Sequence, residues 1–169
     1  MSAPVIRPGA QDVARAVRRL HVRRIRRRIL SALAAIVLIA ALLLGTAFRP
    51  AEVAGRAMLP ALDNGQLIFV NTLDRTPERG QLIRFTRDGE TFVRRVAALP
   101  GDAVALTGGV LSVNGEDVCR KPASADMPAT LTVPAHMYFV IADNPAEGID
   151  SRISRMGLVV SAEVEGVVW

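Results

Sequence analysis

Residues 29–48 read ILSALAAIVLIAALLLGTAF, a run of twenty residues without a charged side chain and with only two hydroxyl side chains, Ser31 and Thr46. A helix rises about 1.5 Å per residue, so a run of this length reaches across a hydrocarbon core of about 30 Å. The run therefore predicts a transmembrane anchor helix. It divides the 169-residue chain into a tail (1–28), the anchor (29–48) and a larger C-terminal region (49–169).

The charge of the chain is unevenly placed around this anchor. The tail holds nine arginines against one acidic residue, Asp12, whereas residues 49–169 hold twelve basic and fifteen acidic residues. Basic residues next to an apolar span stay in the cytoplasm, which predicts a cytoplasmic tail and a C-terminal region on the periplasmic or extracellular side of a bacterial plasma membrane. Because the basic character belongs to the tail, the high isoelectric point does not indicate a nucleic-acid-binding protein.

The N-terminal region has two other interpretations. A cleaved signal peptide usually has an apolar core of about 7–15 residues behind a short basic stretch, and both segments are longer here, so an anchor is favoured. Residues 12–28 alternate apolar residues with arginine, as does an amphipathic helix lying on anionic lipid. A solvated tail that sets the topology is the preferred interpretation.

Beyond residue 49 the pattern changes to short apolar and β-branched runs separated by turn residues. Asp88-Gly89 and Asn114-Gly115 are typical of tight hairpins, because both residue types tolerate a positive φ. No long helical period appears in this region. The sequence predicts a mainly β domain, a coiled antiparallel sheet or distorted barrel, with strands at 66–70, 81–85, 91–96, 103–106, 110–113, 137–141 and 165–169.

Four ordered motifs in this region resemble those of bacterial type I signal peptidases. That family carries Ser-Met-x-Pro after its anchor, then Arg-Gly-Asp, then Lys-Arg-Val-x-Gly-Leu-Pro-Gly-Asp, and finally Gly-Asp-Asn-Arg-x-x-Ser-x-Asp-Ser-Arg. This chain reads GRAMLP at 55–60, RGQ at 79–81, RRVAALPGD at 94–102 and ADNPAEGIDSR at 142–152. The resemblance implies the family's β fold and a role in protein export.

The family removes leader peptides from exported preproteins, after small residues at the −3 and −1 positions, with a serine nucleophile and a neutral lysine base. The resemblance places Ala57 at the serine, Arg94 at the lysine and Gly148 at a second serine that supports the lysine amine. A methyl group supplies no nucleophile, and a guanidinium offers only donors and keeps its proton. Loss of both dyad members typically lowers the rate about 10⁶-fold, so the sequence predicts a pseudopeptidase, a serine protease homologue that is not an active enzyme.

Other positions match the residues that shape the family's site. The matching scaffold residues are Gly55, Met58, Pro60, Asp143, Asn144, Asp150, Ser151 and Arg152. The resemblance implies that residues 50–55 and 90–93 flank an extended peptide, with Glu52, Val53, Phe92 and Val93 as groove candidates. Such a groove binds a peptide as an added strand, so binding needs no serine. The expected partner is an exported or membrane protein segment, and the expected role is assembly or membership of an envelope complex.

Three alternatives remain open. The chain is an active leader peptidase with a substitute nucleophile, a mutant engineered to trap substrate, or a purely structural subunit that binds no peptide. Hydroxyl residues outside the dyad positions have no base nearby in sequence and would need His136 or Lys121; they are Thr86, Ser112, Ser151, Ser154 and Ser161. Ala142 and Pro145 also depart from the pattern, which favours natural divergence over engineering.

Cofactor chemistry is not predicted. Cys119 is the single cysteine and cannot form an intrachain disulfide, and the two histidines, His21 and His136, show no metal-ligand spacing. The sequence therefore predicts neither a metal site nor a cofactor site, and no small-molecule or nucleic-acid partner.

Overall fold

The computed structural model describes residues 10–119 and 125–169, with side chains given from residue 25 onward except at 43–44. Lys121 lies outside the described residues. The chain forms two compact units that meet between Gly45 and Thr46, and each is described by itself.

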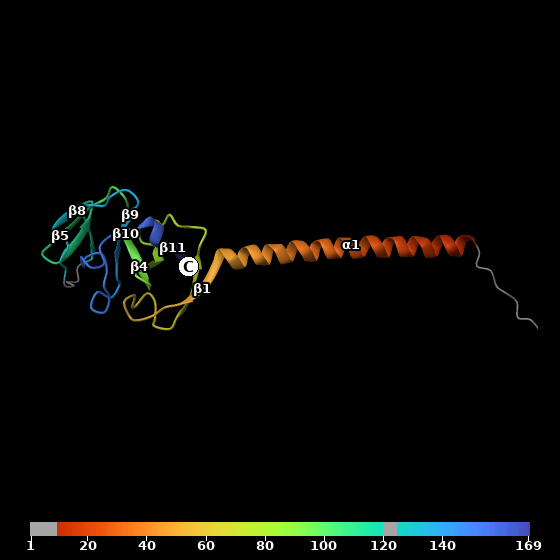
Figure 1. Ribbon diagram of the computed structural model, residues 1–169, viewed down its shortest axis with the longest axis horizontal. Coiled ribbons are helices and arrows are strands. Elements are labelled where there is room, and N and C mark those ends of the chain that lie inside the picture. The colour runs from red at the N-terminus through yellow and green to blue at the C-terminus, as the bar shows by residue number, and fades with distance from the viewer. Residues whose placement is uncertain (1–9, 120–124) are drawn as a thin grey trace, which may run out of the picture. The chain divides into compact units, whose positions relative to one another are not determined.

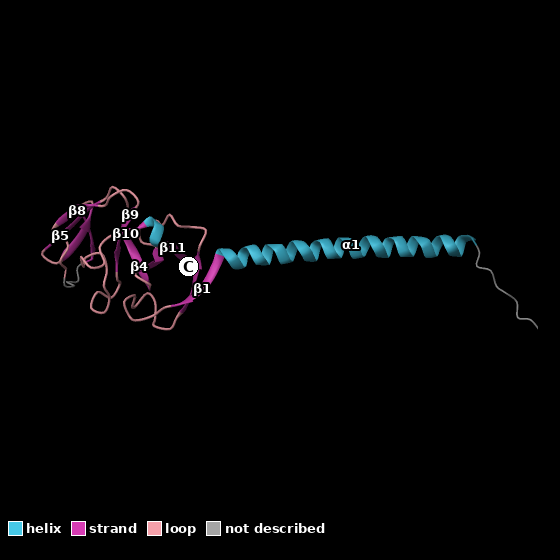
Figure 2. Ribbon diagram, viewed as in Figure 1, coloured by secondary structure: helices cyan, strands magenta, loops and turns pink. Residues whose placement is uncertain are grey.

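Helix α1 (Ala10–Ala47) is the only long helix of the described chain (Figure 2). Its segment Ile25–Ala47 is long and apolar enough to cross a membrane, and the described side chains from Ile25 to Leu42 are exposed. The helix starts earlier than the predicted anchor because the alanine, leucine and arginine of the tail are good helix formers. It ends one residue earlier, since Phe48 already belongs to a strand.

The second unit is built from two antiparallel sheets (Figure 1). The larger has seven strands in the order β1 (Phe48–Glu52), β2 (Leu67–Asn71), β11 (Val164–Val168), β3 (Leu82–Arg87), β4 (Glu90–Ala98), β9 (Met137–Ile141) and β10 (Val159–Val160). The smaller has four, in the order β7 (Glu116–Cys119), β6 (Val110–Val113), β5 (Ala103–Thr107) and β8 (Thr130–Thr132). A 3₁₀ turn, η1 (Ser161–Glu163), precedes β11. The mainly β fold class is confirmed.

The predicted strands and hairpins are present, with boundaries that differ by one or two residues. Asp88 and Gly89 have φ values of 53° and 80°, and Asn114 and Gly115 have 53° and 85°, as tight hairpin turns require. The prediction missed β1, β7, β8 and β10. β1 contains Pro50, which breaks a strand pattern in sequence but is tolerated at the edge of a sheet, where β1 lies.

Strand β9 separates the main cores of the domain. Tyr138 and Val140 pack into a cluster with Ile83 of β3, whereas Phe139 and Ile141 pack into a second cluster with residues of the small sheet. Successive side chains of a strand point to opposite faces, so β9 is buried on both sides. A third cluster, which includes Val53, Met58 and Ile68, lies under the turn that follows β1.

The segment 142–152 returns alongside β9 and is fixed by a buried ion pair. The Asp150 carboxylate accepts hydrogen bonds from the Arg152 Nε at 3.0 Å and Nη2 at 2.5 Å, and from the Ala142 N–H at 2.9 Å. Only 1% of the Asp150 side chain and 2% of the Arg152 side chain are exposed. Ser151 donates its N–H to the Val140 carbonyl and accepts the Val140 N–H on its hydroxyl, both at 3.0 Å.

A second ion pair joins β3 to the end of the chain. Arg87 bonds the Glu163 carboxylate with Nε at 2.9 Å and with Nη2, and it also donates to the carbonyls of Met156 and Leu158. The hydrogen bonds from Arg87 lower the pKa of the Glu163 carboxyl, while burial opposes this shift.

We expect Asp150→Asn to lower the free energy of unfolding by about 3–5 kcal/mol, because it removes the carboxylate charge that the buried Arg152 guanidinium faces. Thermal unfolding in detergent measures the effect. The double variant Asp150→Asn with Arg152→Met removes both charges and is expected to be more stable than the single variant. A single variant as stable as the wild type would show that the pair does not support the fold.

A pH dependence follows from the lowered pKa of Glu163. Its charged form stabilises the fold above the ordinary carboxyl pKa of 4.5, and this contribution is lost as the pH falls through the lowered value. Glu163→Gln is therefore expected to destabilise the protein at pH 7 and to unfold like the wild type in more acidic solution. The unfolding midpoints of both proteins are measured across this pH range. Parallel curves of midpoint against pH would contradict the pairing of Glu163 with Arg87.

Candidate functional site

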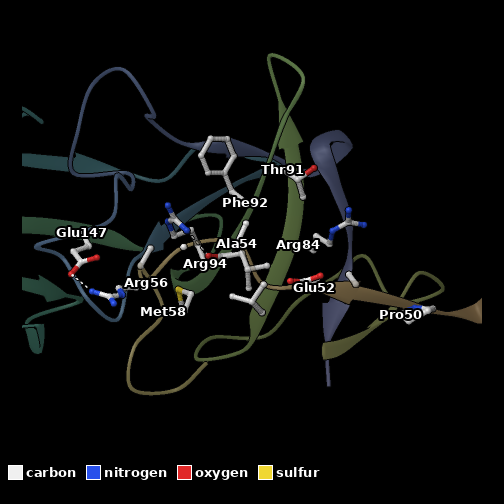
Figure 3. A pocket seen from close by; sticks show the side chains of 15 residues that line it. Pro50, Glu52, Ala54, Arg56, Met58, Arg84, Thr91, Phe92, Arg94 and Glu147 are labelled. Atoms are coloured by element: carbon white, nitrogen blue, oxygen red, sulfur yellow. Dashed lines mark hydrogen bonds and ion pairs between the residues drawn. The ribbon is translucent and has the colours of Figure 1, made fainter. Parts of the chain in front are cut away.

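A cavity of about 330 Å³ lies between the segment that follows β1 and the first half of β4 (Figure 3). Residues 50–58 and 91–94 line it, together with Arg84 and Glu147. All four groove candidates from the sequence, Glu52, Val53, Phe92 and Val93, are among the lining residues. The structure therefore brings together two segments that lie about forty positions apart in the chain.

Both strands offer unpaired backbone to this cavity. β1 lies at the edge of the large sheet and pairs only with β2 among the described strands. Residues 90–93 of β4 pair with β3 on one side, while pairing with β9 on the other side begins at Arg95. An open strand edge presents N–H and C=O groups that another extended chain can bond. The cavity is therefore bordered by two edges suited to an extended peptide.

Hydrogen bonds and burial fix the segment that carries Ala57. The N–H of Gly55, which has a φ of 87°, donates to the Asn64 Oδ1 at 2.7 Å, and the Val53 N–H donates to the Gln66 carbonyl at 2.9 Å. Met58 is buried in the core beneath, and its carbonyl accepts the Leu62 N–H at 2.9 Å. Pro60 continues this turn and is exposed. The Ala57 methyl group is thus held at the cavity wall.

The last motif packs against Ala57. Asn144 donates its N–H to the Ala57 carbonyl at 2.8 Å and its side-chain amide to the Arg56 carbonyl at 3.2 Å. A Cβ added to Gly148 would lie 2.6 Å from the Ala57 Cβ and 2.8 Å from the Ala142 Cβ. Real Cβ atoms do not approach so closely, so the missing side chain at 148 lets the two segments touch. Sequence spacing gave no sign of this contact.

Arg94 lies at the inner side of the cavity with 7% of its surface exposed. Its Nε donates to the Ile149 carbonyl at 2.7 Å, its Nη1 donates to the Val93 carbonyl at 2.6 Å, and its guanidinium carbon lies 5.5 Å from the centre of the Phe92 ring. Burial lowers the pKa of Arg94, and the charge of Asp150 opposes this shift. The guanidinium of an arginine stays protonated, so a positive charge is buried here.

The other two arginines of the cavity each lie beside a carboxylate. Arg84 pairs with Glu165, and Arg56 lies 4.0 Å from Glu147. Figure 3 shows the Arg56 and Glu147 side chains at the end where Arg94 lies, and Arg84 with Thr91 at the other end. Among the described residues Arg94 has hydrogen bonds to carbonyl groups and no ion pair with a carboxylate.

Arg95 is a site residue that the sequence analysis missed. The scaffold residue Asp143 pairs with Arg95, whose Nε lies 2.8 Å from the Asp143 Oδ1, whereas Asp150 pairs with Arg152. Arg95 also donates to the Gly80 carbonyl at 2.7 Å, and its hydrogen bond with Asp143 raises its pKa against the effect of burial. The alternation of side chains along a strand could have predicted separate partners for Arg94 and Arg95, because neighbouring residues of a strand point to opposite faces.

Thr91 is the single hydroxyl side chain among the residues that line the cavity. Its Oγ1 lies 3.1 Å from the Thr86 Oγ1, which in turn donates to the Glu165 Oε1 at 2.6 Å. Sequence spacing indicated no base near Thr86 or Ser154. In the folded chain the Thr86 hydroxyl donates a hydrogen bond to Glu165, and the Ser154 hydroxyl donates one to Asp126. Ser151 is buried in its bonds to Val140, and His136 is exposed and does not line the cavity.

Metal binding has no candidate in the part of the chain that the structure describes, where no three His, Cys, Asp or Glu residues form a group able to hold an ion. The polar side chains that line the cavity carry hydroxyl, carboxylate and guanidinium groups. Within the lining residues these are Thr91, two glutamates and three arginines.

The chain is similar to known proteins of one family. Residues 26–169 match the family model described as signal peptidase, peptidase S26. The signal peptidase I of Bacillus amyloliquefaciens is 32% identical over 146 residues, which cover 77% of this chain and 78% of that protein. Signal peptidase I S of Bacillus subtilis (strain 168) is 33% identical over 147 residues, covering 77% and 79%.

Among solved structures, a signal peptidase I from Enterococcus faecalis V583 aligns with 56% of this chain and 97% of its own, at 29% identity and a TM-score of 0.44. The family model extends over the cavity, the motif segments and most of helix α1's apolar part. On these matches, the chain belongs to the signal peptidase I family.

Proposed function

We propose that this chain is a membrane-anchored pseudopeptidase that binds an extended segment of an exported or membrane-inserted protein without cutting it. The anchor at 29–48 spans the plasma membrane, the tail (1–28) is cytoplasmic, and the domain at 49–169 lies on the outer side. The nine arginines before the apolar run support this orientation. Bound in this way, the protein acts in assembly or as a subunit of an envelope complex.

The pair Ala57 and Arg94 carries the proposal. Acyl transfer by a serine requires a hydroxyl and, within hydrogen-bond reach, a base with a free lone pair. Position 57 offers a methyl group, and position 94 offers a guanidinium whose Nε and Nη1 already donate to the carbonyls of Ile149 and Val93. Neither group accepts a proton, so the family's Ser/Lys mechanism has no nucleophile and no base here.

Binding depends on features that the chain retains. The open edges of β1 and of residues 90–93 support an extended chain added between them, with backbone hydrogen bonds supplying affinity. Ala54, Ala57 and Val53 are small side chains in the wall, which favours small side chains on the bound segment. The scaffold is intact as well, since Asn144 holds Ala57 and Asp150 holds the return segment.

A second candidate is an active leader peptidase that uses Thr91. One observation favours it, because the Thr91 hydroxyl lines the cavity and connects through Thr86 to the Glu165 carboxylate. The same carboxylate is paired with Arg84, which makes it a poor base. Cleavage that is abolished by Thr91→Val and unaffected by Arg94→Gln would establish this candidate.

We expect the full-length protein in mild detergent to leave a preprotein with Ala at −3 and −1 uncut. Mass spectrometry of the products measures this, with an active signal peptidase I as positive control. The double variant Ala57→Ser with Arg94→Lys is also expected to be inactive, because Gly148 has no hydroxyl to hold the lysine amine. Cleavage by the wild type that persists when Ala57 or Arg94 is replaced would refute the proposal that the protein is a pseudopeptidase.

The contact at Gly148 gives a prediction about stability. Gly148→Ser places a Cβ within 2.8 Å of two methyl groups and is expected to destabilise the domain by about 1–3 kcal/mol. Ala142→Gly removes one of these methyl groups, so the double variant should recover part of the loss. Thermal unfolding provides the measurement, and Ala54→Ser, on an exposed residue of the same cavity, is the matched control. A neutral Gly148→Ser would contradict the packing.

A further inference from the structure

Arg94 is a buried cation without an anionic partner. With 7% of its surface exposed it has lost most of its hydration, yet its hydrogen bonds reach only two carbonyl oxygens. Carbonyl groups compensate part of the lost hydration but leave the net charge unopposed. The other buried arginine, Arg152, shows the usual arrangement, because it faces a carboxylate in the same segment.

The carboxylate whose charge acts on Arg94 is that of Asp150, and this carboxylate already accepts hydrogen bonds from other groups. Asp150 acts on Arg94 only through its charge, while its two oxygens accept from Arg152 and from the Ala142 N–H. Glu147, which also lines the cavity, lies beside Arg56. Glu52, the other glutamate of the lining, lies at the end of the cavity where Arg84 lies (Figure 3), and no carboxylate of the described chain forms an ion pair with Arg94.

The free donors of Arg94 are reachable from the cavity. A guanidinium carries five N–H bonds, and only Nε and Nη1 have partners in the described structure. Every fully buried side-chain nitrogen and oxygen of the described residues has a hydrogen-bond partner, so Nη2, which has none, keeps some exposed surface. Because Arg94 lines the cavity, this accessible nitrogen is available to a ligand bound there.

The shape of the cavity indicates which carboxylate fits. Its open strand edges align an extended backbone, and Ala57 and Arg94 both line the cavity that such a chain would enter. A chain that stops at this point presents its terminal carboxylate, whose two oxygens match the planar donors of a guanidinium. A chain that continues presents a neutral amide carbonyl, which leaves the buried charge unopposed.

We propose that the groove of this pseudopeptidase recognises the free C-terminal carboxylate of an extended peptide through Arg94. This inference rests on the proposed function, because it specifies the ligand of the same groove. The ligand class is a chain that has already been cut or that naturally ends there, with small residues near its end, such as a released leader peptide.

The test uses the full-length protein in mild detergent and fluorescently labelled peptides of one sequence, with an apolar segment followed by Ala-x-Ala. The first peptide has a free C-terminal acid, the second a C-terminal amide, and the third continues for several residues beyond the last alanine. A fourth carries the amide with Glu in place of the last alanine. Fluorescence anisotropy gives the dissociation constant of each.

We expect the free acid to bind at least about tenfold more tightly than the amide or the extended peptide, as a charge-assisted bond at a buried site implies. Arg94→Gln should abolish this preference, and Arg94→Lys should retain part of it. Arg155→Gln removes an exposed arginine that does not line the cavity and should leave the preference unchanged. The comparison of peptides on the wild type stands even if an Arg94 variant fails to fold.

The remaining outcomes separate this inference from the proposed function. Equal binding of all four peptides would overturn carboxylate recognition and leave peptide binding standing. A Glu-containing amide that binds as tightly as the free acid would show recognition of an acidic side chain and overturn the assignment to the chain terminus. Binding of none of the peptides would overturn both proposals.

Discussion

The carboxylate of Asp150, buried against the guanidinium of Arg152, fixes the part of the molecule on which the site depends. It also accepts the N–H of Ala142, so one side chain closes the loop between the end of β9 and residue 152. Asn144, Gly148 and Ile149 all lie inside this loop, and each contacts the other half of the site: Asn144 and Gly148 at Ala57, and Ile149 at Arg94. The geometry around Ala57 and Arg94 is thus set by a pair that contacts neither side chain.

The substitutions at these positions form a mutually compatible set. With no side chain at 148, the loop lies directly on the methyl groups of Ala57 and Ala142. The same loop presents the Ile149 carbonyl to the Nε of Arg94, which gives the longer and larger cation a fixed hydrogen-bond acceptor. A hydroxyl at 57, or a side chain at 148, would have to share space that these contacts now fill. The site is therefore packed around the residues it has, and this consistency argues against a single recent replacement.

Much of the fold could be predicted from local sequence signals, and much of the site could not. The apolar run and the Asp88-Gly89 and Asn114-Gly115 turns act through neighbouring residues, so helix α1 and the hairpins were predicted. The pairing of Asp143 with Arg95, and of Thr86 with Glu165, joins residues that are 48 and 79 positions apart, and spacing carries no information about them. The motif resemblance pointed to Glu52, Val53, Phe92 and Val93, which line the cavity, because motifs carry tertiary information that periodicity lacks. A motif does not state which side chains meet, so it gave no sign that Asp143 pairs with Arg95.

A lysine base at position 94 would have to be neutral, whereas an arginine there stays charged. This difference in charge determines which ligands the groove favours. A catalytic lysine has to be neutral, so the burial that lowers its pKa helps catalysis. Burial also lowers the pKa of Arg94, yet a guanidinium remains charged, so the same low-polarity surroundings now retain an unopposed cation. Such a charge weakens the binding of neutral ligands that leave it unpaired and strengthens the binding of anions. The burial that in the family supports proton removal therefore favours, in this chain, a ligand that brings its own negative charge.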